Sequence, residues 1–261
     1  MKRPNRKWYF IADAHLKPTT IPFEGKRQAR LRDFLIQCLN DADCAGLFIL
    51  GDLFDFWYEY RYYIPKHFFQ IYRIMEEFPQ HGKELHYFAG NHDFQLGTFF
   101  SETLKITTHD QPWIWQVDGK RYLLDHGDGR APADKGYRLL KKILRNPLCQ
   151  AFFSLIHPDW GMRSGMSASS ISRQANHDPE LEIDELKIDP YIEWAVKTLE
   201  ETDFDGIIIA HTHHAHHEQI DKKLFISLGP WLHKESYMVY QAGQFSFHTY
   251  QQEYSNGIAI P

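Results

Sequence analysis

Five short runs, each followed by a polar motif, predict buried strands that end in functional residues. The runs are residues 7–12, 45–50, 85–89, 121–124 and 206–210. They lead, in that order, into the motifs DAH, GD, GNHD, DHGD and HTHH. A short apolar run bounded by turn residues is typical of a buried strand, and open α/β folds place their ligands at the carboxyl ends of such strands. We therefore expect the five motifs to gather at one edge of a sheet.

Apolar residues with a period of 3.6 predict helices between and after these strands. The helical segments are residues 25–41, 65–78, 136–156, 164–175 and 185–202. Asn146-Pro147 predicts a break within the third of them. Closing strands are expected at residues 224–228, 237–241 and 244–250. The pattern predicts an α/β fold with one domain, residues 1–261, that carries a helical insertion at residues 130–176.

Composition narrows the class of protein. The chain has 261 residues, a net charge of −5, 15% aromatic residues and 16 histidines. The negative charge argues against a protein that coats nucleic acid, so no nucleic acid partner is expected. Three widely spaced cysteines, Cys38, Cys44 and Cys149, support neither a disulfide framework nor a cysteine zinc site, which fits a reducing cytoplasm. No run approaches the roughly 18 apolar residues of a membrane span, so any membrane contact is expected to be peripheral.

The predicted insertion differs in charge from the rest of the chain. Residues 130–175 contain eight Lys or Arg and two acidic residues, a net charge of +6 within a chain of −5. Two interpretations stay open. The segment is either a solvated helical face or a cap that meets an anionic, partly apolar ligand or an acidic lipid surface.

The polar residues at the predicted strand ends form a candidate metal site. They are Asp13, His15, Asp52, Asn91, His126, His211 and His213, with His92 beside them. Imidazole together with carboxylate and amide oxygen points to Mn²⁺, Fe²⁺ or Zn²⁺ rather than Ca²⁺. Seven ligands are too many for one ion but suffice for two if a carboxylate bridges. Paired ions are the usual device for hydrolysing phosphate esters.

The ordered series D-x-H, G-D, G-N-H-D, H-G-D and H-T-H resembles the calcineurin-like metallophosphoesterase family over residues 13–213. This resemblance implies a four-layered αββα sandwich. It implies one ion held by Asp13, His15 and His213, a second held by Asn91, His126 and His211, and Asp52 as the bridge. A metal-bridging hydroxide would attack phosphorus in line. His92 would contact the phosphate or protonate the leaving oxygen, so Asp52, Asn91 and His92 are expected to be catalytic.

A longer resemblance covers nearly the whole chain. GDLFDFW, GNHDFQLG, ADKGYRLLKKILRNPLCQAFF, SASSISRQAN and SLGPW are similar to the UDP-2,3-diacylglucosamine hydrolase family of lipid A biosynthesis. The resemblance implies a pyrophosphatase that releases UMP and 2,3-diacylglucosamine 1-phosphate, with two divalent ions, Mn²⁺ foremost. It also implies attachment to the cytoplasmic face of the inner membrane. The expected substrate contacts are Asn91, His92, Asp134, Tyr137, Ser172, Asn176 and His211.

Departures from that family keep other substrates open. His92 stands where the best-known branch has Arg, and Arg binds phosphate bidentately but cannot act as an acid at neutral pH. Asp55, Ala210 and Ala215 also differ from the common pattern, which has Glu, Gly and Pro. One alternative is a metallophosphoesterase for nucleotides, cyclic nucleotides or nucleic acid ends. The other is a non-catalytic protein that binds lipid or nucleotide with the same fold.

Overall fold

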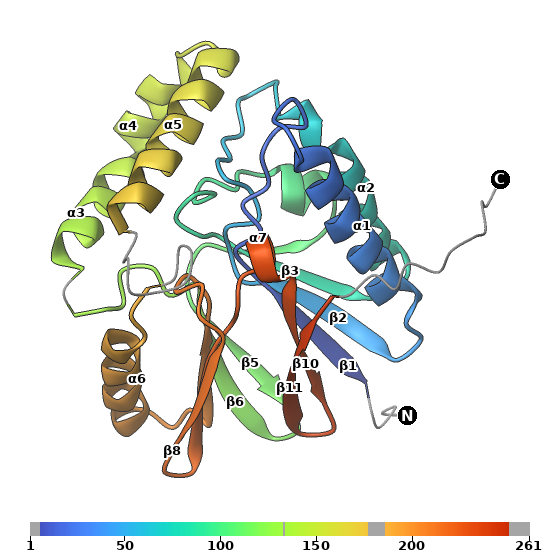
Figure 1. Cartoon of the computed structure of the whole chain (residues 1–261), viewed down its shortest axis with the longest axis vertical. Coiled ribbons are helices and arrows are strands. Elements are labelled where there is room, and N and C mark those ends of the chain that lie inside the picture. The colour runs from blue at the N-terminus through green and yellow to red at the C-terminus, as the bar shows by residue number, and fades with distance from the viewer. Residues whose placement is uncertain (1–5, 133, 177–185, 251–261) are drawn as a thin grey trace.

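The computed structural model describes residues 6–132, 134–176 and 186–250, and their side chains except those of residues 171–176 (Figure 1). Two sheets form the centre of the fold. The first has the strand order β11-β10-β1-β2-β3-β4, and the second has the order β5-β6-β7-β9-β8. Strands β1, β2, β3 and β4 run parallel to one another, as do β6, β7 and β9. The parallel strands therefore bring their carboxyl ends to a common edge within each sheet.

The strand bounds are as follows. The first sheet contains β1 (Lys7–Ile11), β2 (Cys44–Ile49), β3 (Glu84–Phe88), β4 (Thr107–His109), β10 (Ser236–Gln241) and β11 (Gln244–Thr249). The second sheet contains β5 (Trp113–Val117), β6 (Lys120–Leu124), β7 (Gly206–Ile209), β8 (His216–Ile220) and β9 (Lys223–Ser227).

Three hydrophobic clusters separate four layers. Helices α1 (Glu24–Asn40) and α2 (Phe69–Gln80) pack on the outer face of the first sheet, with Tyr9 and Ile11 of β1 in that cluster. Phe10, between them, points to the opposite face, where the two sheets pack together. Helix α6 (Asp189–Glu201) covers the outer face of the second sheet. The αββα layering implied by the family resemblance is thus confirmed.

Three consecutive helices follow β6 and form a lobe beside the sheets (Figure 1, yellow-green). They are α3 (Lys135–Leu144), α4 (Pro147–Ser154) and α5 (Pro158–Asn176). The chain breaks between α3 and α4 because Pro147 opens the second helix, and the Asn146 side chain accepts a hydrogen bond from the Leu148 amide at 2.9 Å. The lobe contacts the body of the protein through aromatic residues. Phe153 lies 4.7 Å from the Tyr58 ring, centroid to centroid.

Several elements differ from the prediction. Helix α5 begins at Pro158 rather than at residue 164, and the helix expected at 65–78 is a short 3₁₀ turn, Lys66–Phe68, followed by α2. Strands β4 and β8 and the π-helical turn Phe99–Thr103 were not predicted. The β8 sequence HHEQI lacks an apolar run, so tertiary pairing with β9 specifies that strand. Within the described residues, no helix combines the length and apolar character needed to cross a membrane.

Candidate metal centre

All seven proposed ligands follow the carboxyl ends of parallel strands. Asp13 and His15 follow β1, Asp52 follows β2, Asn91 follows β3, His126 follows β6, and His211 and His213 follow β7. The two sheets each contribute to the set, so their edges meet at the site. As expected, the motifs lie together at a sheet edge. They come from two sheets rather than from one.

The backbone at these positions is unusual. Five of the seven residues have a positive φ, between 43° and 69°. They are Asp13, His15, Asp52, His211 and His213. Side-chain-bearing residues rarely adopt this left-handed conformation, and such strain concentrates where function requires a side chain to point in a fixed direction.

Two glycines let the loops after β2 and β3 approach each other. Gly51 has a φ of +90°, and a Cβ there would clash with the His126 ring and lie 2.9 Å from the Gly90 Cα. A Cβ on Gly90 would clash with the Asp52 carboxylate and lie 2.6 Å from its amide nitrogen. Both positions exclude a side chain because the carboxylate and imidazole occupy that space.

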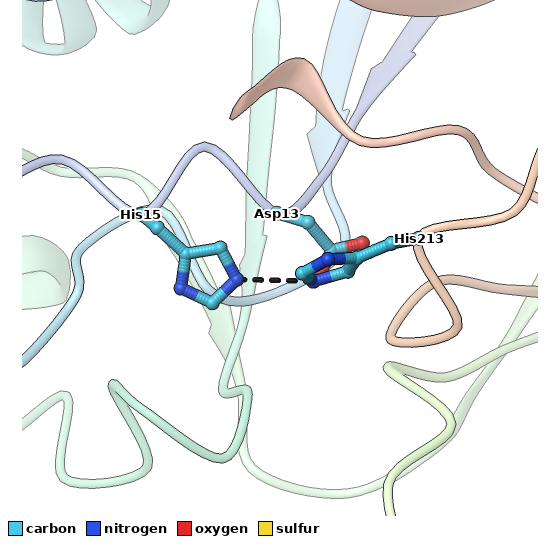
Figure 2. Close-up of side chains that lie close together, drawn as sticks. All are labelled: Asp13, His15 and His213. Carbon is cyan, nitrogen blue, oxygen red and sulfur yellow. Dashed lines mark hydrogen bonds and ion pairs between the residues drawn. The ribbon is translucent and has the colours of Figure 1, made fainter. Parts of the chain in front are cut away.

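The first group contains Asp13, His15 and His213 (Figure 2). Nε2 of His15 lies 3.1 Å from Nε2 of His213, and the latter lies 3.7 Å from Oδ1 of Asp13. Asp13 is fully buried, and its Oδ2 accepts a hydrogen bond from the His211 amide at 3.1 Å. Its Oδ1 accepts no hydrogen bond within the described part of the chain. A buried carboxylate oxygen directed at imidazole nitrogens fits a cation ligand.

The second group is centred on His126. Its Nε2 lies 3.0 Å from Oδ1 of Asn91 and 3.3 Å from Oδ2 of Asp52. Its Nδ1 lies 2.7 Å from the Leu50 carbonyl, which fixes Nδ1 as the hydrogen-bond donor and leaves Nε2 free to bind a metal. His211 joins Asp52 and His126 with ligand atoms within 4.8 Å of one another.

Asp52 lies between the two groups. Its Oδ2 is 3.3 Å from Nε2 of His126 and 3.8 Å from Nε2 of His15. The carboxylate is buried and belongs to the second group while also approaching a member of the first. This position suits a carboxylate that is shared by two cations.

The electrostatics of the site favour cations. Burial raises the pKa of Asp13 to about 8, with a further increase from the nearby Asp52 carboxylate. The protein groups alone thus disfavour the ionised form of Asp13, whose Oδ1 faces two imidazoles. A divalent ion would reverse this preference, since a bound cation stabilises the carboxylate. The donor set of imidazole, carboxylate and amide fits a divalent ion of the Mn, Fe or Zn type.

Asp93 holds the ligand loops in place, a role that the sequence analysis did not assign. Its Oδ1 accepts hydrogen bonds from the amides of Gly90, at 2.8 Å, and Asp52, at 3.1 Å. Its Oδ2 accepts from the Leu53 amide at 2.8 Å and from the Tyr87 hydroxyl. Asp93 therefore fixes the turn that carries Asp52 against the turn that carries Asn91. Its position in the GNHD motif was the available signal.

Asp128 is a second residue with no role in the sequence analysis. It accepts hydrogen bonds from the Tyr137 hydroxyl and the Lys141 ammonium, each at 2.6 Å. Burial alone would raise its pKa, but His126 and Lys141 outweigh that effect and lower the pKa to about 2. Asp128 thus ties α3 to the loop that follows His126. Its position as the last residue of the DHGD motif was the available signal.

His92 has a defined orientation. Its amide donates to Oδ1 of Asp52 at 2.8 Å, and its Nδ1 lies 3.1 Å from the Asp55 carbonyl. The carbonyl only accepts, so Nδ1 is the protonated nitrogen and Nε2 is the reactive one. The His92 ring stands perpendicular to the His15 ring with centroids 4.7 Å apart.

An apolar cavity of about 380 Å³ opens beside the candidate metal ligands. Asn91 and His92 form one end, and Phe56, Tyr58 and Phe94 form one wall. The opposite wall comes from the helical lobe and includes Tyr137, Leu140, Leu144, Phe153 and Ser169. Of the remaining expected substrate contacts, Asp134 precedes α3 and is absent from this lining, and the side chains of Ser172 and Asn176 lie outside the described residues.

Comparison with known proteins agrees with the site. The family model of the calcineurin-like phosphoesterases matches residues 7–215. A UDP-2,3-diacylglucosamine hydrolase of Porphyromonas gingivalis is 29% identical over 247 residues, which cover 90% of this chain and 94% of that protein. An enzyme of the same name from Photorhabdus laumondii is 29% identical over 231 residues, 87% of this chain and 92% of that one. A third, from Neisseria meningitidis serogroup B, is 25% identical over 228 residues, 85% of this chain and 89% of that one.

The matched region begins at β1, ends just beyond His213, and so contains every residue of the two ligand groups. The chain belongs to the calcineurin-like phosphoesterase family of hydrolytic enzymes, which implies divalent metal ions at this centre.

Proposed function

We propose that the protein hydrolyses the diphosphate of UDP-2,3-diacylglucosamine to UMP and 2,3-diacylglucosamine 1-phosphate. The observation that carries the proposal is the apolar cavity, which opens directly at Asn91 and His92. A phosphoesterase centre next to an apolar cavity suits a phosphate ester with an apolar part. The relatives at 25–29% identity are named as hydrolases of UDP-2,3-diacylglucosamine, which supports this substrate.

Two divalent ions, with Mn²⁺ as our first expectation and Fe²⁺ or Zn²⁺ as alternatives, would occupy the centre. Asp13, His15 and His213 would hold one, Asn91, His126 and His211 the other, and Asp52 both. Bound ions of this kind activate water and offset phosphate charge. The close approach of Asp52 Oδ2 to His126 and to His15 supports its bridging role.

The chain's own residues would position the substrate. With Nδ1 of His92 engaged by the Asp55 carbonyl, Nε2 is left to act on the substrate. Nε2 carries a proton only in the imidazolium form, and in that form it would donate to the phosphate or protonate the leaving oxygen. Tyr137, fixed by Asp128, stands at the cavity wall where the sugar would pass from the metals to the acyl site. Asn91 and His211 are expected to contact the phosphate from the second ligand group.

Helices α3–α5, here called the cap helices, would act as an insertion that receives the acyl chains. They expose large apolar side chains, among them Leu148 at 70%, Phe152 at 71% and Trp160 at 69% exposure. Exposed basic residues of the same helices include Lys135 in α3 and Arg163 in α5. Apolar side chains beside cations suit the surface of an anionic membrane, and we place the enzyme peripherally at the cytoplasmic face of the inner membrane.

Product analysis tests the proposal. Purified protein with Mn²⁺ is incubated with UDP-2,3-diacylglucosamine, with UDP-N-acetylglucosamine and with a cyclic nucleotide. UMP release should be fastest from the diacyl substrate. Turnover of the cyclic nucleotide without UMP release from the diacyl substrate would establish a different phosphodiesterase.

The bridging role of Asp52 has its own test. Asp52→Asn should lower kcat by at least about 100-fold and reduce the metal content, because an amide neither bridges two cations nor balances their charge. Asp221→Asn makes the same change at an exposed turn and should behave like the parent protein. Full turnover in Asp52→Asn would rule out the bridge.

A further inference from the structure

A second cavity lies on the opposite side of α3. It has a volume of about 500 Å³, and Ala89, Asp125 and Asp128 place it next to the loops that carry Asn91 and His126. Helix α3 contributes Leu140 and Leu144 to the apolar cavity but only basic residues to this one. The basic residues are Arg138, Lys141 and Lys142, joined by Arg130 and Arg145 from either end of the helix. We call this space the basic cavity.

The basic cavity carries an excess of positive charge. Five basic side chains face three acidic ones, Asp110, Asp125 and Asp128, which leaves a net charge of +2. Arg130 pairs with Asp125 and Lys141 pairs with Asp128, each at 2.6 Å. Arg145 donates only to the Asp110 carbonyl, at 3.1 Å, and its buried Nε has no hydrogen-bond partner among the described residues. Such a charge, together with an unsatisfied donor, fits an anionic ligand.

The opposite wall, residues 109–112, contains the aromatic ring of His109. The His109 ring stacks on the Phe88 ring at 4.3 Å with an interplanar angle of 21°, and it lies 4.9 Å from the Trp113 ring. Burial lowers the pKa of His109 to about 4, so the ring is neutral at pH 7. Gln111 and Pro112 line the cavity beside it. An aromatic surface next to an amide, which both donates and accepts, suits a nucleobase.

We propose that the basic cavity binds the nucleoside monophosphate half of the substrate, an inference that rests on the function proposed above. Lys142 and Arg145 face its phosphate and ribose, and the wall formed by His109 and Gln111 faces its base. The substrate then lies across helix α3 at the metals, with its acyl chains on the apolar side of the helix and its nucleotide on the basic side. The cavity volume lies within the range of about 300 to 1,000 Å³ that is usual for small-molecule sites.

Calorimetric titration with UMP tests the inference on the Mn²⁺-loaded protein. Lys142→Gln and Arg145→Gln should each weaken the dissociation constant for UMP by about tenfold, because each removes a charge-assisted contact. Lys135→Gln is the matched control, since Lys135 is an exposed cation on the same helix outside the cavity lining. Metal content and melting temperature are measured for every variant, so that a misfolded protein is recognised.

A second arm separates nucleotide from lipid phosphate. The same variants are sedimented with phosphatidylglycerol vesicles. Loss of vesicle binding with an unchanged dissociation constant for UMP would overturn the inference and assign the cavity to lipid headgroups. Unchanged UMP binding in both variants would overturn it as well, even where the parent protein releases UMP from the diacyl substrate. The titration needs no turnover, so failure of the proposed function gives a separate result.

Discussion

Nε2 of His15 and Nε2 of His213 lie 3.1 Å apart although 198 residues separate them in the chain. Two ligands at about 2.1 Å from a shared ion and at right angles to each other would be about 3.0 Å apart. The pair therefore has the spacing of two ligands of one ion before any ion is bound.

This spacing predicts the effect of losing one imidazole. His213→Ala should reduce the bound metal from two ions per chain toward one and lower kcat by at least about 100-fold. Mass spectrometry of metal content and a phosphodiesterase assay measure the two effects. His217→Ala removes an exposed imidazole from β8 and should change neither. Two retained ions in His213→Ala would remove His213 from the ligand set.

Asp93→Asn should damage both stability and activity. The amide nitrogen would face backbone N–H groups that now donate to a carboxylate, which costs about 2 to 3 kcal/mol for buried charged acceptors. Displacement of the Asp52 and Asn91 turns should lower kcat about 10- to 100-fold. Urea unfolding and steady-state kinetics measure these changes.

Tyr87→Phe is the matched control for Asp93→Asn. It removes one donor to the same carboxylate and leaves the backbone contacts in place. A loss of about 1 kcal/mol with little change in kcat is expected. Equal kinetic damage in both variants would mean that Asp93 does not act through the loop amides.

The stacked histidines predict a pH dependence of stability. Burial, with a contribution from His86, lowers the pKa of His109 from 6.5 to about 4, and burial also lowers the pKa of His86. Between these two pH values the unfolded chain takes up protons that the folded chain does not. The free energy of unfolding should therefore fall as the pH drops from about 6.5 toward about 4.

Urea unfolding at pH 7.5 and pH 5 measures this loss. His109→Gln removes one titrating ring, so its loss between the two pH values should be smaller by about 1 kcal/mol, a figure reduced for partial solvent exposure. The same pH dependence in the variant and the parent would place the titration elsewhere.

The apolar cavity predicts a change in selectivity. Ala168→Phe places a ring in the cavity lining and should lower the ratio of kcat/KM for the diacyl substrate to that for a water-soluble phosphodiester by at least about tenfold. Ala151→Phe adds the same ring at an exposed position of the neighbouring helix α4 and should leave that ratio near the parent value. An unchanged ratio in Ala168→Phe would separate the cavity from substrate binding.

The sequence predicted the strands whose own residues form a clear apolar run. Apolar runs predicted β2, β3 and β7, and the residues after them include the candidate metal ligands. Strand β4 has three residues and β8 carries HHEQI, so both depend on pairing with a neighbour rather than on their own pattern.

The contacts that surround the candidate ligands could not be predicted from the sequence. The hydrogen bonds of Asp93 join segments about 40 residues apart, and those contacts exist only once the two turns meet. The basic cavity likewise combines α3 with the loop at residues 109–112, which the charge count of the insertion could not reveal.

The left-handed backbone at five proposed ligand positions has a consequence for how the chain can change over evolutionary time. Each such residue costs about 1 to 3 kcal/mol relative to a relaxed conformation. Glycine would relieve that cost at Asp13 or His15 but would remove a proposed ligand. Selection for catalysis therefore opposes selection for stability at these turns. A descendant of this chain that no longer needed the ions would gain stability by replacing these residues with glycine.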